Sequence, residues 1–248
     1  MLATTSTSQQ LPEIRARLLD GESSVEPRIS NLLAPNEQSA IRQIATIIDY
    51  TSGTPVFAEG GEACFVYSVV SGVVRLCRHS GAGRRQILTL MLPGDLFGMP
   101  DAGIYVNSAE AICATTLYRV PWVRLRDLLT RQPLLQLSLL NKVTHDLREA
   151  QRRIVILGQQ NISQRLSSLL LDFVQHPAFF DSANSLVTLP LSRFDIADYL
   201  GTAPETVARG FLRLEREGLV RRITSRLIHI RDFDGLTNLP MRKRRVDD

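Results

Sequence analysis

Residues 192–230 read SRFDIADYLGTAPETVARGFLRLEREGLVRRITSRLIHI, and no other segment of the chain carries so definite a structural pattern. A short amphipathic helix is predicted first, with its apolar positions at Phe194, Ile196, Ala197 and Leu200. This helix ends at Gly201. Pro204 can open a second helix, because its missing N–H would have no partner in a first turn. Apolar residues then recur at helical spacing, at Val207, Phe211 and Leu214.

Two further features indicate the function of this pair of helices: the charged face of the second helix and the residues that follow it. The charged side chains lie off the apolar stripe, at Glu205, Arg209, Arg213 and Arg216. Residues 218–230, GLVRRITSRLIHI, are typical of two short strands around a turn. A helix-turn-helix followed by such a wing places one helix in the major groove of DNA. The segment therefore predicts double-stranded DNA as a partner.

Composition limits the class of protein. The chain has 248 residues, enough for about two domains, and a formal net charge of +4. No apolar run approaches the roughly 20 residues of a membrane span, so no membrane association is expected. The N-terminus lacks the apolar core of an export signal, and three cysteines without framework spacing suggest reduced thiols. A cytoplasmic location is expected.

Residues 54–120 consist of short β-type runs separated by Gly and Pro, which predicts an antiparallel barrel or jelly roll. Strand alternation places Val74 and Leu76 on one face, with Arg75, Cys77 and His79 on the other. The same alternation groups Leu88, Leu90 and Leu92. The run Ser80-Gly-Ala-Gly is expected to form a hairpin, and residues 36–50 an amphipathic helix.

A long helix beginning at Pro133 carries the second strong pattern, after a shorter helix over 122–129. Its apolar residues alternate spacings of three and four and form what we call the seam: Leu140, Val143, Leu147, Ala150, Ile154 and Leu157. One interpretation is a helix packed within its own domain. The other, favoured by the flanking charges and by the position between two domains, is a dimer interface. A further amphipathic helix is predicted over 161–176, followed by the strand-like residues 185–191.

These patterns divide the chain into five parts. We expect a loose arm over residues 1–30, a β-roll over 31–120, and helices including the dimerisation helix over 121–158. A winged helix-turn-helix follows over 159–232, and a solvated tail over 233–248.

The order of these parts and several local motifs resemble the bacterial CRP/FNR family, typified by the cyclic-AMP receptor protein and the fumarate and nitrate reduction regulator. The motifs are Pro93-Gly-Asp-Leu-Phe-Gly98, Asp195-Ile-Ala-Asp-Tyr-Leu-Gly201 and Glu205-Thr-Val-Ala-Arg209. The resemblance covers residues 35–232. It implies an α+β fold: an N-terminal antiparallel β jelly roll of the cyclic-nucleotide-binding type, a long dimerisation helix and a C-terminal winged helix-turn-helix. It also implies a homodimeric transcription activator that reads a palindrome and contacts RNA polymerase.

Matched to the family position by position, Glu205 and Arg209 correspond to base-reading residues on the recognition helix over 204–217. A carboxylate can accept from the cytosine amine, and an arginine can grip guanine. The alternatives are a capping box between Thr202 and Glu205 and a phosphate contact for Arg209. Backbone contacts are expected from Arg193, Thr206 and Arg213.

The sequence departs from the family at two positions of this helix. Pro204 replaces an additional base-reading arginine of the cyclic-AMP receptor type, and Ala208 replaces a serine frequent in the nitrate-reduction type. The resemblance therefore implies a TTGAT-like half-site with less definite outer positions.

The family's cyclic-nucleotide cassette is altered in this chain. Met99-Pro100 stands where a Gly-Glu pair would begin, and Asn107-Ser108 replaces the Arg-Ser pair that holds the cyclic phosphate. A phosphate buried without a cation carries a heavy desolvation cost, which argues against cyclic AMP as the ligand.

Motifs for other cofactors are also missing from the sequence. An iron–sulfur cluster needs about four thiolates, and no cysteine precedes Cys64. The haem-binding member of the family has Cys and His where this chain has Gly98 and Pro100. Cys77 and His79 share a C-x-H spacing, but two ligands alone are a weak metal signal, and we expect no metal site. Buried, inert thiols are expected for Cys64, Cys77 and Cys113, although Cys64 follows a Gly-Gly turn and would be open to oxidation if it were exposed.

In lacking these motifs the chain resembles the FixK-like branch of the family, whose members have no obvious cofactor motif. No cofactor is therefore expected. Two alternatives stay open: a regulator gated by haem, nitric oxide or another small effector in the β-roll, and a regulator modulated by thiol redox. Catalysis is not expected, because His79, His145, His176 and His229 are scattered and form no nucleophile or metal motif.

Overall fold

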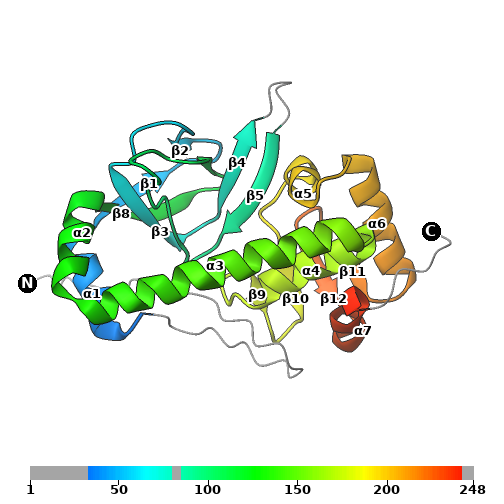
Figure 1. Ribbon diagram of the computed structural model, residues 1–248. Coiled ribbons are helices and arrows are strands. Elements are labelled where there is room, and N and C mark those ends of the chain that lie inside the picture. The colour runs from blue at the N-terminus through cyan, green and yellow to red at the C-terminus, as the bar shows by residue number, and fades with distance from the viewer. Residues whose placement is uncertain (1–32, 80–84, 242–248) are drawn as a thin grey trace, which may run out of the picture.

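A computed structural model describes residues 33–79 and 85–241. The predicted N-terminal arm, the Ser80 hairpin and the last residues of the tail lie outside these ranges. Figure 1 shows an elongated molecule with a β-roll at one end and a smaller helical unit at the other, and helix α3 runs along both.

The β-roll consists of two antiparallel sheets of four strands each. Their orders are β1-β8-β3-β6 and β2-β7-β4-β5. The strands are β1 (Thr46–Tyr50), β2 (Pro55–Phe57), β3 (Phe65–Ser71), β4 (Val74–His79), β5 (Arg85–Met91), β6 (Leu96–Phe97), β7 (Ser108–Ala111) and β8 (Thr115–Pro121). Aromatic rings fill the space between the sheets, where Phe57 stacks on Tyr105 with ring centroids 3.8 Å apart. The predicted jelly roll is confirmed.

The helix predicted over 36–50 is wrong in its second half. Helix α1 spans Pro35–Ile44, and β1 follows it closely and pairs along its whole length with β8. The spacing of Ile41, Ile44 and Ile48 suits a helix, but the β-branched run Thr46-Ile47-Ile48 suits a strand beside a free sheet edge. Pairing with β8 therefore outweighs the local helical pattern.

The predicted alternation is also wrong in β5, because a β-bulge shifts the register. Leu76 pairs with Thr89, whereas Cys77 pairs with Ile87, so Leu88 is the extra residue. Ile87, not Leu88, is buried with Leu90 in the same core.

Helices α2 (Trp122–Arg131) and α3 (Pro133–Gln159) follow the roll. Helix α3 has two distinct faces. The buried one packs on its own chain through Leu135, Leu139, Lys142 and His145. The seam lies on another face, where Leu140, Leu147 and Ile154 are 60%, 59% and 71% exposed. Only Leu157, at the end of the seam, is half-buried. The interpretation that the seam packs within its own domain is therefore wrong for most of its length.

The smaller unit contains α4 (Ile162–Val174), α5 (Arg193–Leu200), α6 (Pro204–Arg216), α7 (Phe233–Asn238) and the 3₁₀ turn η1 (Leu239–Met241). A third sheet, in the order β11-β12-β10-β9, supports them. Its strands are β9 (Phe180–Asp181), β10 (Leu186–Thr188), β11 (Val220–Arg222) and β12 (Leu227–Ile230). The α+β class and the winged helix-turn-helix are confirmed.

The prediction that the tail begins at residue 233 is wrong. Residues 233–241 fold into α7 and η1, and Leu236 is fully buried. Gln164 of α4 donates from its side-chain amide to the Leu239 carbonyl at 3.1 Å, which anchors this segment on α4. The sequence lacks a long apolar repeat here because the helix has only six residues.

Within residues 33–79 and 85–241, no helix combines the length and the apolar character needed to cross a membrane.

Candidate nucleic-acid interface

Helix α5 is the first helix of the helix-turn-helix, and both of its ends are capped. The Ser192 hydroxyl accepts from the Asp195 backbone N–H at 3.0 Å, and the Asp195 carboxylate accepts from the Ser192 N–H at 3.1 Å. Gly201 ends the helix with φ 62°, in the left-handed region that favours glycine. The turn to α6 is therefore short and well defined.

Helix α6 starts at Pro204 with Ala203 as its N-cap, and no side chain caps it. The alternative capping box between Thr202 and Glu205 is thus not formed. Because the N-cap falls at Ala203, Glu205 occupies the second helical position and its carboxylate is not used to close the helix end.

The two helices of the motif are held against α4 by close packing. Val207, Phe211 and Leu214 of α6 are buried, as predicted. Gly210 allows α6 to approach α4, since a Cβ there would lie 2.6 Å from Leu166 Cδ1 and 2.9 Å from Ile162 Cγ1. The sequence pattern did not indicate this role for Gly210.

Phe194 does not belong to the core of α5, contrary to the prediction, because its side chain is 69% exposed. It occupies the first turn of α5, on the face that points away from the buried residues of the motif. Ile196, Ala197 and Leu200 are buried as expected.

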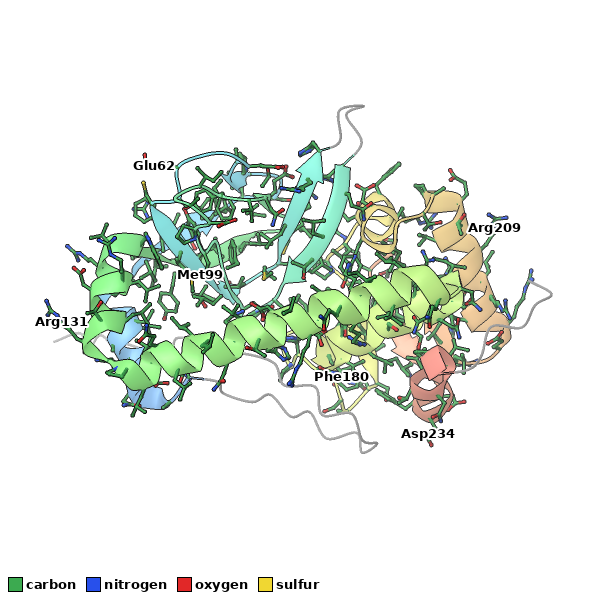
Figure 2. The ribbon with its side chains drawn as sticks, viewed as in Figure 1. Glu62, Met99, Arg131, Phe180, Arg209 and Asp234 are labelled. Atoms are coloured by element: carbon green, nitrogen blue, oxygen red, sulfur yellow. The ribbon has the colours of Figure 1, made fainter. Side chains whose placement is uncertain are left out.

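The predicted base-reading residues lie on the outer surface of α6. Glu205 and Arg209 are exposed and one helical turn apart. The Arg209 guanidinium donates to the Thr206 hydroxyl at 3.1 Å, so the structure brings two of the predicted DNA contacts together. Figure 2 shows Arg209 on α6, at the end of the molecule opposite Arg131.

The predicted backbone-contact residues are distributed around this surface. Arg193 is exposed in the first turn of α5, and Arg213 is exposed on α6, where it pairs with Glu217 at 2.9 Å. Further exposed arginines lie on α6, on the wing and just after it, at Arg216, Arg221, Arg226 and Arg231. This accumulation of cations suits a polyanion.

An ion pair fastens the wing to α6. Arg222 of β11 pairs with Glu215 of α6 at 2.7 Å, and its backbone N–H donates to the same carboxylate at 3.0 Å. The hydrogen bond from the Arg222 side chain lowers the pKa of Glu215 from its usual value. The carboxylate is therefore ionised at neutral pH and fixes the position of the wing relative to α6.

An ion-pair group that sequence reasoning missed joins α5 to the β-roll. We call it the junction cluster: Arg75, Arg85, Glu110, Asp195 and Asp198. Asp195 accepts from Arg75 at 2.7 Å and from Arg85 at 2.9 Å, while Arg85 also pairs with Asp198 at 2.8 Å. Arg75 is bonded in addition to Glu110 of β7. Asp195 itself is buried, so the carboxylate that caps α5 also holds it to β4 and β5.

The apolar core continues across the same boundary. Cys77, Ile87 and Leu90 of the roll are buried in one cluster with Leu166, Leu200 and other residues of the smaller unit. The helix-turn-helix is therefore packed against the β-roll and is not carried on a free linker.

Two arginines connect α5 to the end of α3 and the start of α4. Arg153 of α3 lies over the Tyr199 ring, 3.4 Å from its centroid, and donates to the Tyr199 carbonyl. Arg165 of α4 donates to the carbonyls of Leu157 at 2.7 Å, Gln160 at 3.0 Å and Leu200 at 2.8 Å. One guanidinium thus satisfies terminal carbonyls of both α3 and α5.

A cavity of about 500 Å³ lies between the β-roll, α3 and α4. The roll contributes apolar and aromatic groups together with Asn107, and α3 contributes Lys142 and Arg152. Each of these cations has an acidic partner: Lys142 pairs with Asp146 at 2.6 Å and Arg152 with Asp172 at 3.6 Å. The cassette motif lies in the roll alone, so the sequence did not indicate that α3 supplies these cations.

The cysteines differ in their surroundings. Cys77 is buried and Cys113 is half-buried, but Cys64 is exposed, so the prediction of a buried thiol is wrong for Cys64. Cys64 stands before β3, outside the paired strands that would cover it. Desolvation and the neighbouring Glu62 raise the pKa of Cys64, which keeps the thiol protonated and less reactive.

Comparisons with known proteins agree with this architecture. Residues 164–239 match the Crp-like helix-turn-helix domain family, and residues 47–132 match the cyclic nucleotide-binding domain family. The nitrogen fixation regulation protein FixK of Azorhizobium caulinodans is 36% identical over 80% of this chain and 81% of its own length. The transcriptional activatory protein AadR of Rhodopseudomonas palustris is 32% identical over 82% and 86%. The solved structure of FixK2 from Bradyrhizobium japonicum is similar with a TM-score of 0.74 at 31% identity, covering 79% of this chain and 97% of that one.

Proposed function

Because this chain belongs to the CRP/FNR family of transcription regulators and resembles its FixK-like members, we propose that it binds a palindromic, TTGAT-like DNA site as a homodimer and activates transcription. The observation that carries the proposal is the outward position of Glu205 and Arg209 on α6, beside a wing fixed by Arg222. Because its proposed target is DNA, the protein would act in the cytoplasm. The proposed function includes no catalysis.

In the proposed complex α6 lies in the major groove. Arg209 donates two hydrogen bonds to a guanine, and Glu205 accepts from a cytosine amine. Thr206 releases Arg209 when the guanidinium turns to the base edge. Arg193 and Arg213 contact phosphates, which orient the protein without specifying sequence.

The seam supplies the proposed dimer interface. Its exposed leucines, valine and isoleucine are spaced for packing against a second α3, and α3 already uses another face for its own chain. Two seams related by a twofold axis would present two α6 helices to successive half-sites of a palindrome.

Binding of the purified protein to a randomised DNA library tests the base-reading role. We expect Arg209→Ala to lose about 1–3 kcal/mol, with the loss confined to one base pair per half-site. Arg193→Ala is the matched control, since a lost phosphate contact weakens all sequences alike and lowers the salt dependence of binding.

A uniform loss in the Arg209→Ala variant would make Arg209 a phosphate contact. DNA affinity that does not fall with added salt would contradict the phosphate contacts altogether. In vitro transcription with purified RNA polymerase checks activation, and repression from the same site would contradict it.

A second candidate is a regulator gated by a small effector, and the cavity of about 500 Å³ favours it. A ligand between the roll and α3 would contact both the sensor and the helix that carries the seam. A Soret band after haem reconstitution supports haem as this effector. A colourless protein whose DNA affinity is already maximal supports effector independence.

A further inference from the structure

Three side chains on neighbouring strands of the β-roll bring metal-binding atoms together. Cys77 and His79 lie on β4, and Glu110 lies on the adjacent strand β7. The Cys77 sulfur, one imidazole nitrogen of His79 and one carboxylate oxygen of Glu110 lie within 4.8 Å of one another. Cys77 is buried, Glu110 is half-buried and His79 is exposed, so the group runs from the core to the surface.

The donor set selects among metals. A thiolate and an imidazole favour zinc over the hard cations calcium and magnesium, which prefer oxygen ligands. Zinc with three protein ligands keeps a fourth position for water. The exposed side of the group, next to His79, can admit that water and the ion.

The interactions of Glu110 leave one of its oxygens for a ligand. The Arg75 Nε donates to Oε2 at 2.9 Å, Arg75 Nη2 bonds to the same atom, and Arg85 approaches it at 3.9 Å. Among the residues that the structure describes, Oε1 receives no hydrogen bond. Glu110 can therefore keep Arg75 and still bind a metal ion.

The surrounding charges accommodate a divalent cation. The junction cluster holds two arginines, Arg75 and Arg85, against three carboxylates, Glu110, Asp195 and Asp198, which leaves one negative charge. Deprotonation of Cys77 adds a second negative charge. A zinc ion with two positive charges then neutralises the group, which lowers the cost of placing it beside two arginines.

From these observations we infer that Cys77, His79 and Glu110 form a zinc-binding site at the boundary between the β-roll and the helix-turn-helix. Glu110 is bonded to Arg75, and Arg75 is bonded to Asp195 in α5. A zinc ion at this site is therefore two hydrogen-bonded contacts from the first helix of the DNA-binding motif. This inference is independent of which DNA sequence the protein binds.

The three cysteines of the chain allow a direct test. In the double variant Cys64→Ser/Cys113→Ser of the full chain, Cys77 is the sole thiol left. Cobalt(II) is added to this variant as a spectroscopic substitute for zinc, and zinc affinity is measured by competition. We expect a thiolate-to-cobalt charge-transfer band that zinc abolishes at one equivalent per chain.

Adding His79→Ala to the double variant gives the decisive comparison. His79 is exposed, so its loss should leave folding intact, which circular dichroism checks. We expect zinc affinity to fall at least about 10-fold, the lower end of the effect of even an outer-shell change. His229→Ala is the matched control, since it removes an imidazole in the wing and should leave affinity unchanged. Absence of the thiolate band, or equal affinity with and without His79, overturns the inference.

Discussion

Gly72, between β3 and β4, is a position of the β-roll that accepts only glycine. Its φ is 85°, and a Cβ there would lie 2.5 Å from the Ala114 carbonyl oxygen and 2.7 Å from Thr115 Cα. Both neighbours are backbone atoms, in the first residue of β8 and the residue just before it, and they cannot move without disturbing the pairing of β8 with β3. Conformation and space therefore both require glycine.

We expect Gly72→Ala to destabilise the protein by about 2–5 kcal/mol. The left-handed conformation accounts for about 1–2 kcal/mol and the overlap for about 1–3 kcal/mol. Gly53→Ala separates the two causes, because Gly53 has φ 80° but nothing within 4 Å of a new Cβ. The free energy of unfolding in urea measures both variants, and equal losses would show that the overlap relaxes without cost.

Single residues were predictable from the sequence where their role is local. Pro204 and Gly201 mark helix ends through their own backbone geometry, and the structure places both as predicted. Asp195 is different. Its capping role follows from Ser192 three residues earlier, whereas its bonds to Arg75 and Arg85 join residues 120 and 110 positions away. No local pattern contains that information.

At the scale of elements, α3 is the most consequential helix because it has two faces with leucines and different neighbours. The face of Leu135 and Leu139 is buried in its own chain, and the seam of Leu140 and Leu147 is exposed. Periodicity identified the seam, but it could not show that the other face already satisfies the domain core.

We expect Leu147→Glu to weaken the proposed dimer. A symmetric interface contains the change twice, so a cost of about 1–2 kcal/mol per subunit gives about 2–4 kcal/mol in total. This corresponds to roughly a 30- to 700-fold rise in the dimer dissociation constant, measured by analytical ultracentrifugation. Asn141→Glu adds the same charge to α3 at an exposed position outside the seam and should leave the constant unchanged. A fully dimeric Leu147→Glu protein would place the interface elsewhere.

Errors at the element scale arise where pairing between strands overrides local pattern. Residues 46–50 are helical by spacing but become β1 because β8 offers an edge. Leu88 shares an alternation with Leu90, yet the bulge opposite Leu76 and Cys77 moves it out of register. The first error depends on a partner strand that is distant in the sequence. The second depends on a shift of register between neighbouring strands.

For the whole molecule, the junction cluster joins the helix-turn-helix to the β-roll, next to the apolar core that the two units share. Arg85 contacts both Asp195 and Asp198 of α5, and its side chain is only 22% exposed. Hydrogen bonds to charged groups contribute about 1.5–3 kcal/mol when they are partly shielded from solvent.

We therefore expect Arg85→Ala to speed amide hydrogen exchange in α5. A loss of about 1.5–3 kcal/mol in the opening free energy corresponds to exchange roughly 10- to 150-fold faster. Arg78→Ala is the control. Arg78 pairs at 3.1 Å with Glu59, which also belongs to the roll, so its loss should not alter exchange in α5. Unchanged exchange after Arg85→Ala would mean that the shared apolar core alone holds the two units together.

The order of domains was predictable from composition and periodicity. The β-roll shows short β-type runs, α3 shows apolar residues at spacings of three and four, and the C-terminal unit shows the helix-turn-helix pattern. The contact between domains was not, since it depends on pairs such as Arg85 and Asp198 that meet only after both units have folded. The cavity was missed for the same reason, because its walls come from the roll, α3, α4 and α5.

The bonds of Arg165 to the ends of α3 and α5 have a consequence for the entropy of binding. Only Gln160 and Asn161 separate α3 from α4, and the carbonyls of Leu157, Gln160 and Leu200 are held by one side chain. This arrangement ties the end of α5 to the end of α3, and so restricts how α6, which follows α5 closely, can be oriented relative to α3. A recognition helix that is already oriented loses less conformational freedom when it docks, so more of its contact energy appears as affinity.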